Sequence, residues 1–208
     1  MISELKTKAK ESLKGKWGPT IAVFLIYGIL SGIGSSLSTK YEVVDGQLTN
    51  VASPTLSVIG SVISIVVTCL LALGYYSYFL KISRNEKPGI DELFSKVGMF
   101  FRCLAATVLI GLIVFAGCLV LIVPGIILSL CYSMTYYIML DDEKISPVEA
   151  MKKSREMMRG HKGELFALLL SFIGWALLSV LTCFILLIWL VPYINTTQAN
   201  FYNKIKGE

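Results

Sequence analysis

The chain has 208 residues, of which 55% are hydrophobic and 16% are charged, and its formal net charge is +5 at pH 7. Soluble domains carry about 25% charged residues, so this composition excludes an ordinary soluble domain and favours a membrane protein. The basic residues lie in short segments between apolar runs and form no separate basic, aromatic-bearing module. We therefore expect no nucleic-acid partner.

The sequence contains no pattern typical of a cofactor, a metal or a catalytic group. It has no Gly-rich phosphate loop, no zinc-ligand spacing and no G-x-S-x-G motif. The five cysteines lie in or beside apolar runs without a C-x-x-C pair, so we expect them to behave as small hydrophobic side chains. The single histidine, His161, has no partner set that would make it catalytic. We predict no metal, no cofactor and no enzymatic activity.

The N-terminal segment predicts an amphipathic helix over residues 2–14, followed by a first membrane span over 17–37. Four apolar residues share one helical face: Ile2, Leu5, Ala9 and Leu13. The opposite face is mainly lysine, which suits a helix at the membrane interface that directs its lysines toward anionic headgroups. The span that follows is too long for the apolar region of a signal peptide and is expected to be retained.

The middle of the chain predicts three further spans, over residues 54–80, 100–123 and 126–140. The polar segment before them, residues 38–53, has Lys40 as its single basic residue and is expected to be an external loop. The connection after residue 80 is basic and predicts a second short interfacial helix. In that helix an apolar face (Ile90, Leu93, Phe94, Val97) opposes a polar face (Asp91, Glu92, Ser95, Lys96). Pro124-Gly125 predicts the tight turn between the next two spans.

A third interfacial helix begins at Ser146-Pro147-Val148-Glu149, which is a capping box with Pro at the first helical position. Gly160 suits its C-terminal end. One face is apolar or small, and the other carries four basic side chains that we predict to contact lipid headgroups: Lys152, Lys153, Arg155 and Arg159.

The remaining residues, 164–202, allow two interpretations. One span over 165–191 would place the C-terminus outside, whereas two short spans over 165–182 and 184–202 would return it to the cytoplasm. The second interpretation gives six spans and puts every Lys and Arg except Lys40 on one side, which the positive-inside rule makes cytoplasmic. We favour six spans, in a single domain of three repeat-like units (about 1–81, 88–140 and 146–204) that each end in an aromatic-rich segment.

The apolar runs contain no Lys, Arg, Asp, Glu or His, which disfavours a proton-coupled transporter. The polar residues expected at membrane depth lie near the C-terminus: Asn195, Thr197, Gln198 and Tyr202. Unpaired amides are costly in hydrocarbon, so these side chains should face other helices. They would link helices, line a polar cavity or a site for a lipid headgroup, or belong to an exposed tail.

Four segments resemble a known family: L-K-G-K-W-G at 13–18, E-A-M-K-K-S-R-E-M-M-R-G-H-K at 149–162, L-S-F-I-G-W at 170–175 and P-Y…A-N-F-Y at 192–202. On these segments the chain resembles bacterial integral membrane proteins, mostly Gram-positive, catalogued as domain of unknown function 975. More distantly, it is similar to the membrane domain attached to some glycerophosphodiester phosphodiesterases. The family has no established activity to transfer. Its members tend to have a Gly-containing turn where this chain has Thr182-Cys183-Phe184.

Together these observations predict an all-α, polytopic bundle of about six spans in three hairpins, with amphipathic helices at the inner surface of the cytoplasmic membrane and a cytoplasmic N-terminus. The leading functional hypothesis is a non-catalytic protein that engages anionic lipid headgroups or a partner membrane protein, which could be a second copy of itself. The alternative is a permease-like exporter of small amphiphiles or peptides.

Overall fold

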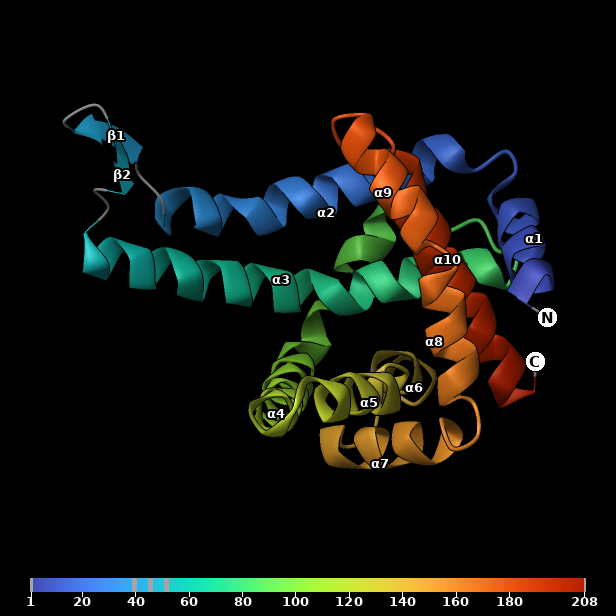
Figure 1. Ribbon diagram of the computed structural model, residues 1–208. Helices are drawn as coiled ribbons and strands as arrows, with labels where there is room; N and C mark the ends of the chain where they lie inside the picture. Colours follow the sequence, from blue (N-terminus) through green and yellow to red (C-terminus); the bar gives the residue numbers. More distant parts are fainter. Residues whose placement is uncertain (1, 39–40, 45–46, 51–52, 208) are drawn as a thin grey trace.

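The computed structural model describes residues 2–38, 41–44, 47–50 and 53–207. These residues form helices apart from one short β-hairpin (Figure 1). In chain order the elements are α1 (Ile2–Leu13), α2 (Trp17–Ser38), β1 (Tyr41–Val44), β2 (Gln47–Asn50), α3 (Pro54–Ser83), the 3-10 turns η1 (Ile90–Phe94) and η2 (Val97–Met99), α4 (Phe100–Val120), α5 (Ile122–Tyr132), α6 (Thr135–Asp141), α7 (Pro147–Met157), α8 (Lys162–Leu170), α9 (Ile173–Leu181) and α10 (Leu187–Lys206).

The helices form three hairpins, α2 with α3, α4 with α5–α6, and α8–α9 with α10, whose tips point in different directions (Figure 1). The predicted all-α membrane fold is confirmed. Among the described residues, four helical stretches are long and apolar enough to cross a membrane: Pro54–Ser83, Ile90–Val120, Ile122–Asp141 and Lys162–Leu181. A fifth results if α1 and the first part of α2, bent by 96°, are taken as one span. The sixth predicted segment is α10, which is helical but is not among these stretches.

Local sequence signals explain where several helices begin. The Ser53 side chain accepts a hydrogen bond from the Leu56 amide at 3.3 Å, and Pro54 occupies the first turn of α3. The predicted Ser146 N-cap of α7 is present, since its hydroxyl accepts a hydrogen bond from the Glu149 amide and donates one to the Glu149 carboxylate, both at 3.2 Å. These caps satisfy amide groups that have no partner inside the helix. Gly160 lies in the turn after α7 with a φ of 83°.

The expected turn at Pro124-Gly125 is wrong by a few residues. The chain turns at Leu121, which is extended, and Pro124 lies in the first turn of α5, where its missing N–H costs no hydrogen bond. Gly125 serves close packing instead. A Cβ there would overlap the Cys118 sulfur and lie 3.1 Å from the Cys118 backbone nitrogen. The glycine therefore allows α5 to approach α4.

The C-terminal segment forms two antiparallel helical stretches and not one long helix. The chain turns after Leu181, where Cys183 and Phe184 adopt left-handed backbone conformations with φ values of 49° and 65°. At the far end of the stretches, the Lys204 ammonium lies 3.5 Å from the Glu164 carboxylate. The end of α10 therefore returns to the level at which α8 begins. The structure thus has the two helical segments of the favoured interpretation, joined by a turn without glycine, whereas their crossing of the membrane as two spans stays a prediction.

The predicted interfacial segments pack against the protein. In α1, Leu5 and Leu13 are buried in the two larger hydrophobic clusters of the molecule, and Ala9 between them is fully buried. The second predicted interfacial helix is instead the pair of 3-10 turns η1 and η2. The prediction that Glu92 lies on an exposed polar face is wrong, because Glu92 is only 7% exposed. Lys40, the expected external basic residue, lies outside the described residues. In the same segment, β1 and β2 pair as antiparallel strands.

Candidate functional site

Asp141, the last residue of α6, connects the ends of three helices. Its carboxylate accepts hydrogen bonds from Arg84 at the end of α3 (3.1 and 3.3 Å) and from the Tyr202 hydroxyl of α10 (2.6 Å). The Lys206 ammonium lies 2.7 Å from the same carboxylate. The Asp141 side chain is 18% exposed, so these donors replace most of the water that would otherwise solvate it. The end of each helical hairpin is thereby tied to one carboxylate.

Tyrosine rings from the same three helices pack beside Asp141. The Tyr76 ring of α3 stacks on the Tyr136 ring of α6, with centroids 5.1 Å apart. The next residue, Tyr137, lies edge-on to Tyr76 and stacks on Tyr202 of α10 at 5.2 Å. The aromatic-rich segments at the ends of the three units are therefore in mutual contact, and α3, α6 and α10 form the centre of the fold.

The four polar residues predicted at membrane depth lie on α10 but do not share one cavity. The Asn195 amide donates hydrogen bonds to the Tyr75 hydroxyl (3.1 Å) and to the Val191 carbonyl (2.9 Å). The buried Thr197 hydroxyl bonds to the Tyr193 carbonyl one turn earlier at 2.7 Å, and Gln198 is half-buried. Tyr202 lines a 450 Å³ cavity beside α7, and none of the other three residues lines that cavity.

Glu92 forms a second buried polar cluster that the sequence pattern did not predict. Its carboxylate accepts hydrogen bonds from Ser77 (2.5 Å) and Lys81 (2.6 Å) of α3 and from Ser95 (3.1 Å). The cluster fixes η1 against α3, at the point where Gly74 meets the backbone of Leu93. Periodicity placed Glu92 on the solvent face, because the pattern carries no information about hydroxyl and ammonium groups on another element.

The α7 helix presents the predicted lipid-contacting cations on its outer side. Lys152, Lys153, Arg155 and Arg159 are all exposed, whereas Ala150, Met151, Ser154 and Met158 are buried beneath them. The Ser154 hydroxyl donates to the Cys131 carbonyl (2.8 Å) and accepts from the Met134 amide (3.2 Å). It thus supplies hydrogen bonds at the break between α5 and α6 and fixes α7 against both helices.

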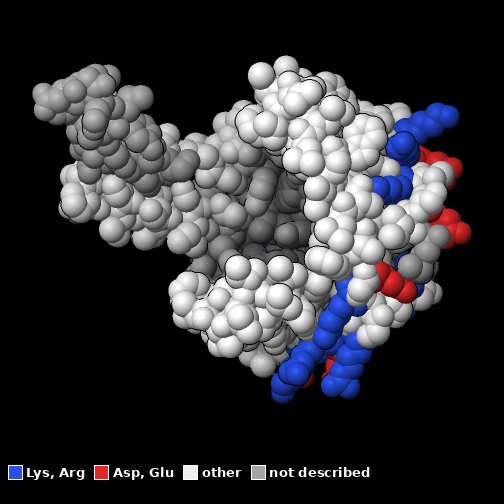
Figure 2. Space-filling view, viewed as in Figure 1, with Lys and Arg blue, Asp and Glu red and all other residues white. Residues whose placement is uncertain are grey.

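The charges of the visible face lie along one side of the molecule, and the rest of the described surface in that view is free of Lys, Arg, Asp and Glu (Figure 2). We call the region formed by α1, α7, the loops after α3 and α6, and the end of α10 the charged end. Lys96 in this region lies 2.5 Å from the Glu143 carboxylate and holds the pKa of that carboxyl below its ordinary value, through its hydrogen bond first and its charge second.

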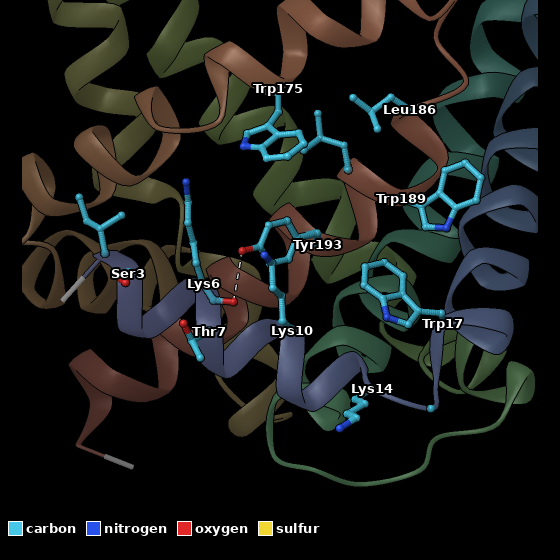
Figure 3. Close-up of a pocket in the computed structure, with 13 residues that line it drawn as sticks. Ser3, Lys6, Thr7, Lys10, Lys14, Trp17, Trp175, Leu186, Trp189 and Tyr193 are labelled. Carbon is cyan, nitrogen blue, oxygen red and sulfur yellow. Dashed lines mark hydrogen bonds between the residues drawn. The ribbon is translucent and has the colours of Figure 1, made fainter.

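A groove of 720 Å³ separates α1 from α9 and α10 at the charged end (Figure 3). Its α1 wall carries Lys6 and Lys10, and Lys14 lies just beyond the end of that helix. The opposite wall is apolar and aromatic, with Trp175, Trp189 and Leu186 labelled in Figure 3. The amphipathic pattern of α1 predicted that its lysines face headgroups but did not indicate the groove. The two walls of the groove come from opposite ends of the chain. The only sequence signal for either wall is the four-residue spacing of Lys6, Lys10 and Lys14, which places them on one helical face.

The helices therefore define a membrane protein with several candidate spans and a charged end. Within the described ranges, no group of three or more His, Cys, Asp or Glu side chains is placed to hold a metal ion. The chain belongs to the family described as protein of unknown function (DUF975), which it matches over residues 1–128 and 112–208. No curated protein and no solved structure matches it.

Proposed function

We propose that this protein is a non-catalytic component of the cytoplasmic membrane that binds anionic lipid headgroups through the four α7 cations of its charged end. The observation that carries the proposal is the outward display of the four α7 cations over a buried face. Because Ala150, Ser154 and Met158 are fully buried, α7 cannot rotate to bring its basic side chains inward. The cations are therefore held at the surface of a protein that also exposes many large apolar side chains.

Three of these cations, Lys152, Arg155 and Arg159, make no ion pair within the described part of the chain, and Lys153 lies 4.0 Å from Asp142. Such cations near an anionic membrane surface contribute about 1 kcal/mol each to lipid attraction. The positive-inside rule supports placing the charged end at the cytoplasmic leaflet.

The exporter alternative requires a polar lining at membrane depth. The Asn195 amide is already engaged by Tyr75 and Val191, and the Thr197 hydroxyl by its own helix. These contacts favour a packing role for the α10 polar residues over the lining of a pathway. They count against the exporter alternative and support association of α10 with α3 as the role of Asn195.

The test uses the full chain in an uncharged detergent and measures the melting temperature during addition of phosphatidylglycerol or phosphatidylcholine. We expect phosphatidylglycerol to raise the melting temperature and phosphatidylcholine to have a much smaller effect. The double variant Lys152→Gln/Arg155→Gln should lose a large part of that increase. The matched control Lys8→Gln/Lys87→Gln removes the same charge from exposed positions outside α7 and should retain it. Equal stabilisation by both lipids would overturn the proposal.

A further inference from the structure

We propose that the groove between α1 and the α9–α10 segment binds a single anionic phospholipid, with its phosphate near Lys6 and Lys10 and an acyl chain along the tryptophan wall. This inference rests on the proposed function and deepens it. General attraction of lipid to the α7 cations requires no defined site, whereas the groove would hold one molecule in one orientation.

The α1 wall supplies a positive charge that is held in place. The Lys6 ammonium donates a hydrogen bond to the Ser171 carbonyl (3.1 Å) and lies 4.2 Å from the centre of the Phe172 ring. The Lys10 ammonium lies 5.8 Å from the centre of the Tyr193 ring. Contacts between a cation and an aromatic face restrict the ammonium group without neutralising its charge. Both charges therefore remain available to a ligand.

The lysine ammonium groups in the groove have no carboxylate partner within the described residues. No Asp or Glu is among the described residues that line it, and neither Lys6 nor Lys10 makes an ion pair within those residues. Ser3 and Thr7 add two hydroxyl groups to the same wall. In Figure 3 the Lys6 side chain extends from α1 toward the wall that carries Trp175 and Tyr193. A ligand with a negative headgroup complements this arrangement.

The opposite wall suits a hydrocarbon chain and not a second charge. All three tryptophans of the chain, Trp17, Trp175 and Trp189, line the groove. Trp175 and Trp189 are 50% and 46% exposed, although large aromatic rings are normally well covered in a folded protein. Tryptophan at the level of lipid headgroups is typical of membrane proteins. The ligand therefore needs an apolar part beside its anionic group, and an anionic phospholipid has both.

The size of the groove agrees with one partly enclosed lipid. Sites for small molecules occupy about 300 to 1,000 Å³, and this groove has a volume of 720 Å³. A free phosphate ion would fill only the lysine end and leave the tryptophan wall uncovered. The three tryptophans together with Lys6 and Lys10 therefore select an amphiphile.

The test is quenching of intrinsic tryptophan fluorescence, since every tryptophan of the chain lines the groove. The full chain in uncharged detergent is mixed with phosphatidylglycerol or phosphatidylcholine that carries bromine on the acyl chain. We expect saturable quenching by the brominated phosphatidylglycerol at mole fractions where the brominated phosphatidylcholine quenches weakly and in proportion to its amount. Inorganic phosphate at matched ionic strength should not displace the lipid.

The variant Lys6→Gln/Lys10→Gln should weaken the apparent affinity for phosphatidylglycerol by about fivefold for each lysine removed. The control Lys8→Gln, an exposed lysine of the same helix outside the groove lining, should leave it unchanged. Equal quenching by both lipids, or the same affinity in the double variant, would overturn the groove as a lipid site. If phosphatidylglycerol still raised the melting temperature in an α7-dependent way, the proposed function would stand without the groove.

Discussion

The hydroxyl group of Tyr202 donates a hydrogen bond of 2.6 Å to Oδ2 of Asp141 and so joins the end of α10 to the end of α6. The same carboxylate accepts two hydrogen bonds from Arg84 at the end of α3. Arg84 lies 57 positions and Tyr202 lies 61 positions away from Asp141 in the sequence. The bonds at Asp141 therefore fix the relative positions of the three hairpins.

Replacing Asp141 with Asn should destabilise the protein by about 1 to 2 kcal/mol. The amide keeps the shape of the side chain but removes the charge that Arg84 and Lys206 contact, and charge-assisted hydrogen bonds are the stronger ones. Thermal unfolding in detergent measures the change. The control is Asp142→Asn, a side chain that is 51% exposed and 4.0 Å from its cation. A comparable loss in both variants would refute the role assigned to Asp141.

Tyr137 and Tyr202 stack on each other but should respond in opposite ways to removal of the hydroxyl group. The Tyr137 hydroxyl is buried and makes no hydrogen bond within the described residues, so Tyr137→Phe should be neutral or stabilising. Tyr202→Phe breaks the bond to Asp141 and should cost about 1 kcal/mol or more. The two melting temperatures, measured in the same detergent, decide the matter. A destabilised Tyr137→Phe would show that this hydroxyl has a partner.

Gly74→Ala should displace η1 from α3. A Cβ at Gly74 would overlap the backbone carbonyl of Leu93, which cannot move as a side chain can. Overpacking of this kind costs about 1 to 3 kcal/mol. The matched control is Gly28→Ala, where a Cβ would meet nothing within 4 Å and the helix would gain propensity. Unchanged stability in Gly74→Ala would contradict the docking of η1.

Ser154→Ala should destabilise the junction of α5, α6 and α7. The substitution removes both hydrogen bonds of the hydroxyl and leaves the Cys131 carbonyl and the Met134 amide without their Ser154 partner in a buried setting. We expect a loss of about 1 to 3 kcal/mol and faster amide hydrogen exchange around Met134. Ser146→Ala, at the exposed cap of α7, should cost about 1 kcal/mol and leave exchange at Met134 unchanged.

The helices could be predicted because their signals are local. Apolar runs marked the membrane segments, and the capping box at Ser146 marked the start of α7 within one residue. The turn at Cys183 and Phe184 was harder to place, since non-glycine residues rarely adopt left-handed conformations. There, the distribution of charge and the repetition along the chain favoured the two short segments that the structure shows.

The candidate site could be predicted only in part, because its contacts are not local. The α7 cations follow from helical periodicity alone. The burial of Glu92 depends on Ser77 and Lys81 of another helix, and the groove requires α1 to lie beside α10. Tyr193 shows this most clearly, since its hydroxyl donates to the Lys6 carbonyl from 187 positions away. No pattern within one segment indicates that contact.

The most direct test of the account is the sidedness of the two ends of the chain. The central claim is that the charged end forms one membrane surface, to which both the α1 and α10 ends of the chain return. Reporters that are active only in the cytoplasm, fused in turn to the N-terminus and the C-terminus of the full chain, measure this directly. The account predicts activity from both fusions. Activity from one fusion alone would place Lys6 and Lys204 on opposite surfaces and contradict it.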